Sequence, residues 1–377
     1  SQEQQQKMEQ LLPGVDVDQD LVRSLADIFY SRDMPVRVRL GAIAKLVGID
    51  QMPPGTALNR KICIWDIAGR NGPVFQAAME QRAMALEYGI CNAVLVCYGS
   101  VQRTGEMDRK AMAKARATMA AYDYETVYSP PMPVGAYAMA AQRHMHQYGT
   151  TRENLAEVAV AARKWANLNP EAFMQGDLSV QDVLDARPVS SPFTVRDCCL
   201  VTDGGGAFVM TRADRAKDLK KKPVYMLGAG TAAWHQKITN LPDLTVTCAS
   251  QSGKEAFAMA GMTPAEVQHL MLYDAFTINP VLFLEDLGFC PKGEGGRFVS
   301  DGRIAPGGSL PLNTNGGGLS CVHPGMYGVY TVIESVQQLR GEGGARQAGQ
   351  IDVSLAHGNG GVLSSQCTAI LGTDAAL

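Results

Sequence analysis

The chain has 377 residues, of which 46% are hydrophobic and 19% charged, so it is long enough for two core-forming domains or two halves of one. Its formal net charge of −3 gives no general attraction to nucleic acid or to an anionic membrane. No apolar run is long enough to cross a bilayer, and residues 1–10 contain no apolar signal-peptide core, so we expect a cytoplasmic protein.

The nine cysteines are odd in number and scattered, mostly in apolar settings, which predicts reduced core residues rather than a disulfide framework. No CxxC pair and no HExxH motif occur, so we expect no metal site. His144 and His146 lie two residues apart on a predicted helix and do not share a face, so they are not a metal pair.

The first predicted elements alternate between strands and helices. Helical periodicity occurs at 19–31 and 36–48; a buried strand at 62–65, a glycine-containing turn, a helix at 73–88 and a second buried strand at 93–98 follow. This order predicts an α/β layer with a parallel sheet.

Residues 101–194 interrupt this pattern with a mainly helical insertion. Its predicted helices span 107–121, 134–148, 152–167 and 179–186. An insertion of this size usually covers one face or mouth of a sheet, so we expect it to contact substrate. Strand character resumes at 207–211.

A similar element order begins again at residue 223. It comprises strands at 224–227 and 267–272, helices at 252–262, 277–287 and 324–340, and strands at 353–357 and 363–371. We therefore predict two similar α/β halves, residues 1–222 and 223–377.

The stretch from Leu310 to Tyr330, LPLNTNGGGLSCVHPGMYGVY, is the principal candidate for a site. Gly316, Gly317 and Gly318 allow close backbone approach or a positive φ, and Pro324 suits the first turn of a helix. We therefore expect His323 at the positive entrance of that helix, where a histidine exchanges protons near neutral pH beside free amides. The alternative is a glycine-rich turn with a capping histidine.

Two more stretches place polar residues after short predicted strands. Tyr273-Asp274-Ala275-Phe276 follows one, and His357-Gly358-Asn359-Gly360-Gly361 follows another. Open α/β sheets carry their sites at such strand ends, so these residues join the candidate site.

Motifs over about 36–372 resemble the thiolase superfamily, within it the sterol-carrier-protein-type or lipid-transfer thiolase-like branch. They include RDCCLVTDGGGA, LYDAFT, LEDLGFCPKGEGG, LPLNTNGGGLS, HPG and HGNGG, with a long match from Ala141 to Pro170. The resemblance implies a five-layer α-β-α-β-α fold, a homodimer or larger assembly, and chemistry on acyl-CoA thioesters.

The chain also departs from this family. The position of the nucleophilic cysteine is matched by about Gly69, and the Asn-Glu-Ala-Phe motif of the oxyanion hole becomes Tyr273 to Phe276. The Gly-His-Pro motif keeps His323, whereas the acid/base cysteine is replaced by His357. Without the cysteine, a covalent acyl-enzyme is not expected. Residues 1–36 also lack the family's first strand, so this half is trimmed or the sequence begins inside a longer polypeptide.

The leading hypothesis is carbon–carbon cleavage or formation through an acyl-CoA enolate, of the retro-aldolase type, because this chemistry needs only a base, an acid and an oxyanion hole. The predicted catalytic residues are His323, His357, Tyr273, Asp274 and Tyr327. The predicted substrate-binding glycines are Gly69, Gly316, Gly317, Gly358 and Gly360. We expect no permanently bound cofactor, with coenzyme A entering as part of the substrate. The resemblance adds a small OB-fold/zinc-ribbon protein as a partner.

Two alternatives stay open. One is acyl transfer of the acetyltransferase kind, for which Cys321 is the nearby replacement nucleophile, although it is more simply a small packed residue. The other is a non-catalytic subunit that carries CoA or lipid. In the leading hypothesis, His323 and His357 act together as one proton-handling pair.

Overall fold

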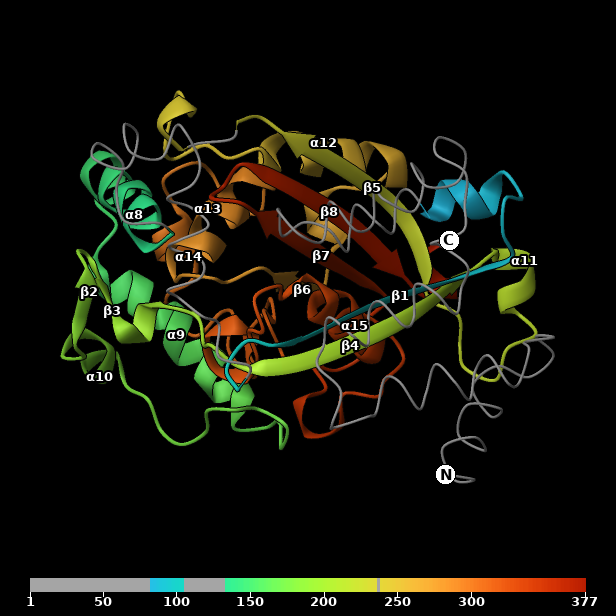
Figure 1. Cartoon of the computed structure of the whole chain (residues 1–377), viewed down its shortest axis with the longest axis horizontal. Coiled ribbons are helices and arrows are strands. Elements are labelled where there is room, and N and C mark those ends of the chain that lie inside the picture. The colour runs from blue at the N-terminus through green and yellow to red at the C-terminus, as the bar shows by residue number, and fades with distance from the viewer. Residues whose placement is uncertain (1–81, 105–132, 236–237) are drawn as a thin grey trace. The chain divides into compact units, whose positions relative to one another are not determined.

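A computed structural model describes residues 82–104, 133–235 and 238–377 (Figure 1). The predicted strand at 62–65, the helices at 19–31, 36–48 and 107–121, and Gly69 lie outside the described residues, as does most of the helix at 73–88. Residues 213–223, with helix α11 (Ala213–Ala216), group apart from the other described ranges. The predicted boundary between halves at residue 222 stays a prediction.

The C-terminal strands form a four-stranded mixed sheet in the order β5-β8-β7-β6. These strands are β5 (Tyr225–Ala233), β6 (His269–Leu272), β7 (Val353–Gly360) and β8 (Ser365–Gly372). β6 and β7 are parallel, whereas β8 is antiparallel to both of its neighbours. Every residue of β6, β7 and β8 is buried, as expected for strands covered on both faces.

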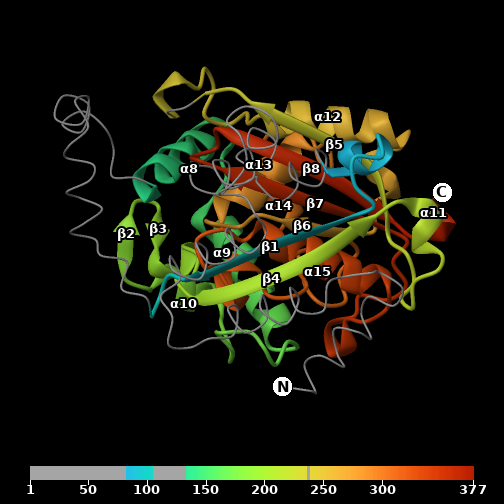
Figure 2. The same ribbon diagram turned by 45° about the vertical axis from the view of Figure 1, so that its right-hand side comes forward.

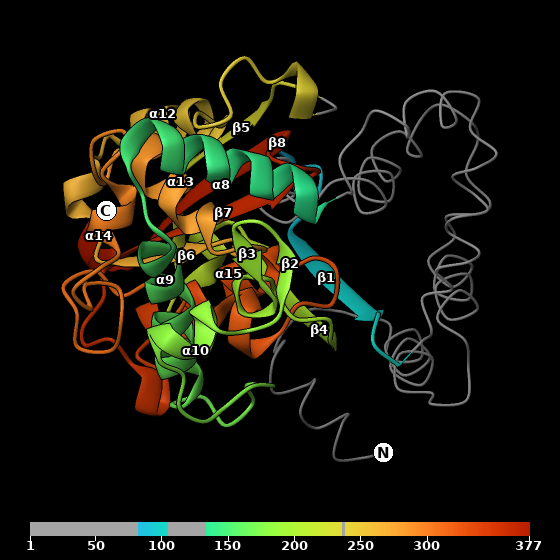
Figure 3. The same cartoon turned by 90° about the vertical axis from the view of Figure 1, so that its left-hand side faces the viewer.

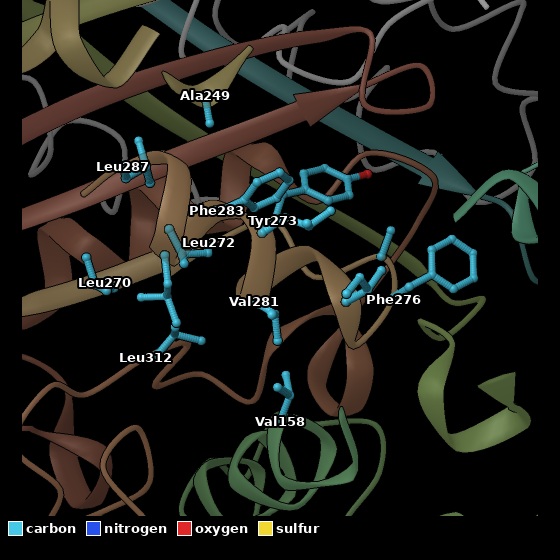
Figure 4. Packing of buried hydrophobic residues seen from close by; sticks show 14 of the residues in the cluster. Val158, Ala249, Leu270, Leu272, Tyr273, Phe276, Val281, Phe283, Leu287 and Leu312 are labelled. Carbon is cyan, nitrogen blue, oxygen red and sulfur yellow. The ribbon is translucent and has the colours of Figure 1, made fainter. Parts of the chain in front are cut away.

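Helices cover both faces of this sheet. Helix α12 (Ala249–Ala260) packs on β5 and β8, where a side chain at Gly228 or Gly230 would overlap the helix backbone. Helix α15 (Gly328–Leu339) packs on β6 and β7 from the other side. Helix α13 (Ile278–Asp286) is buried along nearly its whole length, and its Val281 and Phe283 lie in the main core with Leu270 and Leu272 of β6 (Figure 4).

A second, two-stranded sheet lies on the far side of α15. Its antiparallel strands are β1 (Ala93–Val101) and β4 (Asp203–Thr211) (Figure 2). Gly204 and Gly206 of β4 bring α15 close, because an added Cβ would lie 2.5 Å from Tyr330 Oη and 2.6 Å from Ile333 Cδ1 respectively. α15 is therefore a helical layer between two sheets, which is the central part of the predicted layered architecture.

The described part of the insertion is mainly helical, as predicted. It contains α8 (Val134–Tyr148), α9 (Arg152–Ala166), α10 (Val180–Leu184) and the short strands β2 (Pro188–Ser190) and β3 (Phe193–Thr194) (Figure 3). α8 ends where Gly149 takes φ +74°, and Thr151 forms a capping box with Asn154 at the start of α9. Trp165 Nε1 donates to Ile304 O at 2.9 Å, which ties α9 to the C-terminal half.

The remaining short elements connect these layers. They are the one-turn helix η2 (Val195–Asp197), the 3₁₀ turns η3 (Ile238–Asn240), η4 (Pro264–Glu266), η6 (Gly344–Arg346) and η7 (Asp374–Ala376), helix α14 (Gly295–Phe298), and a π-helical turn η5 (Gly317–Cys321). None of the helices in the described ranges is both long and apolar enough to cross a membrane.

Three sequence expectations need correction. The predicted helix from Pro324 begins at Gly328, because Gly325 takes φ +92° and bends the chain before the helix starts. His357 does not follow its strand but lies within β7, which continues to Gly360 through pairing with β8. β1, predicted to be buried, exposes alternate residues, and it is its partner β4 that packs on α15.

Candidate active site

The end of β6 places the first candidate residues. Asn313 extends the sheet beyond β6 by accepting from Leu272 N at 2.8 Å and donating to Leu272 O at 2.9 Å. Asn313 takes φ +54°, a conformation that asparagine tolerates better than most residues. Tyr273 and Asp274 follow at once, and Tyr273 N donates to His357 O at 3.1 Å. The parallel pairing of β6 with β7 thus brings two of the predicted stretches together.

Tyr273 and His323 form a direct pair. Tyr273 Oη lies 3.1 Å from His323 Nε2, and the two rings meet edge to face with centroids 5.6 Å apart. Burial lowers the pKa of His323 to about 4, so its ring is neutral at pH 7 and Nε2 can accept the phenol proton. Burial raises the pKa of Tyr273 well above its usual range, so the hydroxyl keeps its proton at neutral pH.

His323 does not lie at a helix entrance, which corrects the sequence expectation. It precedes α15 by five residues. Thr202 holds its backbone instead: His323 N donates to Thr202 Oγ1 at 3.0 Å, and Thr202 N donates to His323 O at 3.3 Å. Its position therefore depends on the loop that leads into β4 and not on a helix dipole.

Asp274 is held by the glycine-rich turn. Its Oδ1 accepts from Gly318 N at 2.7 Å, whereas Oδ2 is buried without a hydrogen-bond partner. Burial, only partly offset by backbone donors, raises the pKa of Asp274 to about 7. The carboxyl group is therefore close to half-protonated at neutral pH, unlike either histidine.

The three glycines have the role that the sequence suggested. Gly316 and Gly317 take φ +104° and +67°, and a Cβ on Gly317 would overlap Asp274 Oδ2. Gly318 lies between Asp274 and His323, since its Cβ would lie 3.0 Å from Asp274 Oδ1 and 3.2 Å from His323 Cδ2. The turn therefore needs glycine both for its conformation and for its closeness to these two side chains.

His357 is fully buried in a different set of contacts. Its Nδ1 lies 2.9 Å from Thr368 Oγ1, whose hydroxyl lies 3.0 Å from Ser252 Oγ on α12, and its ring packs 4.6 Å from Phe283. Nε2 is buried with no partner. Burial lowers the pKa of His357 to about 3. In the described residues, no hydrogen bond or ring contact joins His357 to His323.

Tyr327 caps α15 and lies beside Tyr273. Its backbone N donates to Tyr273 Oη at 3.3 Å, and the two rings meet nearly at right angles with centroids 5.8 Å apart. Its hydroxyl donates to Asn315 Oδ1 at 2.7 Å, an atom that also accepts from Gly317 N. Burial raises the pKa of Tyr327 well above its usual range, so it is a neutral donor.

Two predicted glycines lie in β7. Gly358 pairs with Cys367 and Gly360 with Ser365. Between them, Asn359 Nδ2 donates to Tyr137 Oη at 2.7 Å, so α8 of the insertion reaches this end of the sheet. The gathered residues are thus Tyr273, Asp274, His323 and Tyr327 with Gly316 and Gly317, while His357 lies on the neighbouring strand.

Several residues of the site were not predicted from the sequence. Thr202 positions His323, Asn315 holds Tyr327, and Thr368 holds His357. Each is a polar residue that lies 11 or more positions from its partner in the sequence. The only available signal was the asparagine at either end of Asn313-Thr314-Asn315 in an otherwise apolar setting.

Cys321 and Cys199 are unsuited to nucleophilic attack. Burial raises the pKa of Cys321 to about 12, and Asn169 Nδ2 donates to its Sγ at 3.5 Å. Burial also raises the pKa of Cys199, whose backbone N donates to Ala275 O beside Asp274. Within 82–104, 133–235 and 238–377, no group of three or more metal-ligating side chains gathers. His144 instead lies between Thr150 and Glu285.

Comparison with known proteins identifies the family. A family model described as thiolase C-terminal domain-like matches residues 230–373. The chain is 34% identical over 375 residues to an acetyl-CoA acetyltransferase of Methanothermobacter thermautotrophicus, covering 92% of this chain and 95% of that protein. It is 33% identical to the 17-hydroxy-3-oxo-4-pregnene-20-carboxyl-CoA lyase of Mycobacterium tuberculosis, covering 75% and 76% respectively.

Comparison with a solved structure leads to the same family. The Ltp2-ChsH2(DUF35) aldolase superimposes with a TM-score of 0.72 and 32% identity, over 81% of this chain and 78% of that one. The chain therefore belongs to the thiolase superfamily, in its sterol-carrier-protein-type, thiolase-like branch, and has the α/β fold of that family. The predicted family and fold class are confirmed.

Proposed function

We propose that this protein is an acyl-CoA retro-aldolase that works without a cysteine nucleophile. A base removes the hydroxyl proton from the β-carbon of a β-hydroxyacyl-CoA; the Cα–Cβ bond breaks, and its electrons pass to the thioester as an enolate. A carbonyl compound leaves, and protonation of Cα gives the shortened acyl-CoA. The observation that carries this proposal is the 3.1 Å contact between Tyr273 Oη and His323 Nε2, a neutral acid/base pair beside the glycine turn.

Each candidate residue receives a role in this reaction. Tyr273 accepts the β-hydroxyl proton while its own phenol proton passes to His323, so no free phenolate forms. Asp274 is the group that titrates near neutral pH and serves the proton at Cα. Tyr327 donates its backbone N–H to Tyr273, which lowers the cost of charge on the phenol oxygen.

His357 receives the oxyanion role. Its Nε2 is buried and unpartnered, and an unsatisfied buried polar atom is uncommon in a folded protein. When Nδ1 accepts from Thr368, Nε2 carries the proton and donates to the developing enolate oxygen. The backbone close to the thioester is supplied by Gly316, Gly317, Gly358 and Gly360. The predicted contribution of Gly69 falls outside the described residues.

A second candidate is thiolase-type acyl transfer. The 34% identity with an acetyl-CoA acetyltransferase over 92% of this chain favours it. Acyl transfer by the usual route needs a thiolate, and the high pKa of Cys321 makes this thiol a poor nucleophile. We therefore rank the aldolase first and the acyltransferase second, with a non-catalytic CoA or lipid carrier third.

The assembly is also a proposal. The name of the structural relative joins an aldolase chain to a second component, ChsH2(DUF35), so we propose a small partner subunit of the OB-fold/zinc-ribbon kind for this chain. We further propose a homodimer, with acyl-CoA as the substrate and no permanently bound cofactor.

The function is tested by assaying the chain, alone and with a candidate partner, on two β-hydroxyacyl-CoA thioesters. One is short, and the other is the 17-hydroxy-pregnene carboxyl-CoA named for the lyase relative. Mass spectrometry of products should show a carbonyl compound and a shortened acyl-CoA. Tyr273→Phe and His323→Ala should each lower turnover about 10²-fold or more. His146→Ala, an exposed histidine of α8, should not.

Intact-mass spectrometry then separates the two enzyme candidates. After incubation with acyl-CoA, the aldolase should carry no acyl adduct, because burial raises the pKa of the candidate nucleophile Cys321. A stable adduct on Cys321, lost in Cys321→Ser, would replace the aldolase with the acyltransferase. Binding of acyl-CoA with no product from either thioester, and no acetyl exchange between CoA molecules, would leave the carrier.

A further inference from the structure

A small pocket lies behind the glycine turn, between α9, the segment around η2 and the turn η5. Its cavity volume is about 30 Å³. Leu178, Leu200 and Leu319 form apolar walls, and Arg163, Arg196 and Ser320 form the polar side. The pocket is outside the catalytic cluster, and neither the sequence motifs nor the family comparison assigns it a ligand.

Arg163 is an unusual residue to find in this position. It lies on the buried face of α9 with only 5% of its surface exposed. Its Nε donates to Ser320 Oγ at 3.1 Å. No residue in the described ranges forms a hydrogen bond or ion pair with its two terminal nitrogens. These two nitrogens are not among the buried atoms that lack a partner, so they reach the open space of the pocket.

A second arginine adds to the same positive charge. Arg196 lines the pocket, and burial together with the Arg196 charge lowers the pKa of Arg163. Among the described residues, the adjacent Asp197 forms no ion pair with either arginine, and its carboxylate accepts from Thr194 and Thr277. Hydrogen bonds from Ser179, and more weakly the charge of Arg196, lower the pKa of Asp182, but no ion pair joins Asp182 to Arg196.

Ser320 completes the polar side of the pocket. Its oxygen accepts from Arg163, and among the described residues its own hydroxyl proton has no acceptor. Two arginines and a hydroxyl donor therefore line a small space whose lining contains no acidic residue. This donor set matches the oxygens of a tetrahedral oxyanion.

We propose that this pocket binds a single oxyanion of phosphate size, held by the terminal nitrogens of Arg163, by Arg196 and by the Ser320 hydroxyl. The anion is either free inorganic phosphate or one phosphate group of a CoA molecule. Because Ser320 belongs to η5, and Leu200 N donates to Gly318 O at 2.9 Å, the bound anion braces the turn that holds Asp274.

The test uses thermal melts and titration calorimetry of the full chain, with phosphate added against chloride at constant ionic strength. Wild type should show a saturable rise in melting temperature with phosphate. Arg163→Gln and Arg196→Gln should each weaken the apparent phosphate affinity about tenfold or more. Lys164→Gln is the matched control, since Lys164 is the exposed neighbour of Arg163 on α9. It removes the same charge and should leave the response unchanged.

A second measurement distinguishes loss of phosphate binding from a folding defect in Arg163→Gln. In phosphate-free chloride buffer, Arg163→Gln should melt at or above wild type, because it removes one of two like charges that repel each other. The half-buried Arg196 offers an independent variant if Arg163→Gln folds poorly. Equal phosphate responses in wild type and both arginine variants would overturn the proposal, as an adventitious ion elsewhere would then explain the effect.

Coenzyme A and 3′-dephospho-CoA distinguish the two sources of the anion. If inorganic phosphate competes with neither ligand but binds through Arg163, the free ion is the source. If CoA stabilises wild type more than 3′-dephospho-CoA does, and Arg163→Gln abolishes that difference, the 3′-phosphate is the source. If no ligand effect depends on Arg163 or Arg196, the pocket is not an anion site. These binding measurements need no turnover, so they stand apart from the aldolase assay.

Discussion

Asp274 differs from the two histidines in its charge at neutral pH. Burial lowers the pKa of His323 to about 4 and of His357 to about 3, so both rings are neutral at pH 7. The same physical cause raises the pKa of Asp274 to about 7, because its charged form is the anion. At pH 7 the Asp274 carboxyl is therefore the group that readily gains or loses a proton, and the two histidines act as neutral hydrogen-bonding partners.

The first prediction concerns the pH dependence of stability. Between its ordinary pKa of 3.8 and about 7, Asp274 keeps a proton in the folded chain that the unfolded chain has lost. The free energy of unfolding should therefore fall as pH rises through this window, by a total on the order of 4 kcal/mol. Asp274→Asn should abolish this contribution.

The buried histidines act with the opposite sign, since their lowered pKa values make stability rise with pH between about 4 and 6.5. Only the difference in unfolding free energy between wild type and Asp274→Asn isolates the contribution of the carboxyl group. Thermal melts of both proteins from pH 4 to 8 measure it, and wild type should lose stability relative to the variant as pH increases. Parallel curves would show that Asp274 does not titrate in this range.

The second prediction concerns His323 and His357 as a functional pair. They share no contact in the described residues, so a double substitution would be additive if each were only structural. If both serve one transition state, each alanine variant should lower turnover about 10²-fold or more. The loss in the double variant should then be much smaller than the product of the two single losses. Turnover is measured with the true thioester, with thermal melts as the folding control.

Near-normal turnover in either single variant would remove that histidine from the mechanism. In that case Tyr273, Asp274 and Tyr327 are the groups to test next. A product-like loss in the double variant, with both folds intact, would instead show that the two rings act in separate steps.

The sequence predicted those site residues whose type and neighbours are conspicuous. Histidines beside glycines, and a tyrosine and an aspartate after an apolar run, were visible in the sequence. Thr202, Asn315 and Thr368 were not, because a threonine or asparagine acquires its role only from a partner that the fold brings close. The raised pKa of Asp274 likewise depends on burial, which no local pattern reveals.

At the element scale, the π-helical turn η5 links the catalytic groups, and Gly317 is its most constrained residue. We predict that Gly317→Ala costs about 2–4 kcal/mol of stability, because it combines a φ of +67° with overlap of Asp274 Oδ2. It should also lower turnover strongly. Gly261→Ala is the matched control, with φ +64° at the end of α12 and no atom within 4 Å of the added Cβ.

Chemical denaturation compares the two variants. Gly261→Ala should lose only the roughly 1 kcal/mol that a left-handed alanine costs and should keep its activity. An equal loss in both variants would show that φ alone, and not the closeness of Asp274, requires glycine in the turn.

Elements with local signals were predicted well. α8 spans Val134–Tyr148 as expected, since Pro133 and Gly149 mark its two ends. α15 was predicted to begin too early, because Pro324 resembles a first-turn proline and only the φ of Gly325 shows the bend that delays the helix. β7 extends to Gly360 through its pairing with β8, which outweighs the low strand preference of its glycines.

At the scale of the whole molecule, the β1–β4 sheet presents an apolar surface. Leu95 and Val209 stand directly opposite each other in the register and are 64% and 48% exposed. In the described residues, β1 pairs with β4. Exposed apolar surfaces of this kind mark association sites, and natural proteins usually cover them.

The last prediction is that the protein is at least a dimer and that this sheet contributes to the contact. Sedimentation velocity at micromolar concentration should show an assembly of wild type. Leu95→Lys should weaken it about tenfold or more, because a charge placed in an apolar contact must be desolvated. Met259→Lys, on α12 and 60% exposed, is the matched control and should leave the assembly intact. A wild-type monomer would contradict the dimer, whereas equal sedimentation of wild type and Leu95→Lys as dimers would place the interface on another surface.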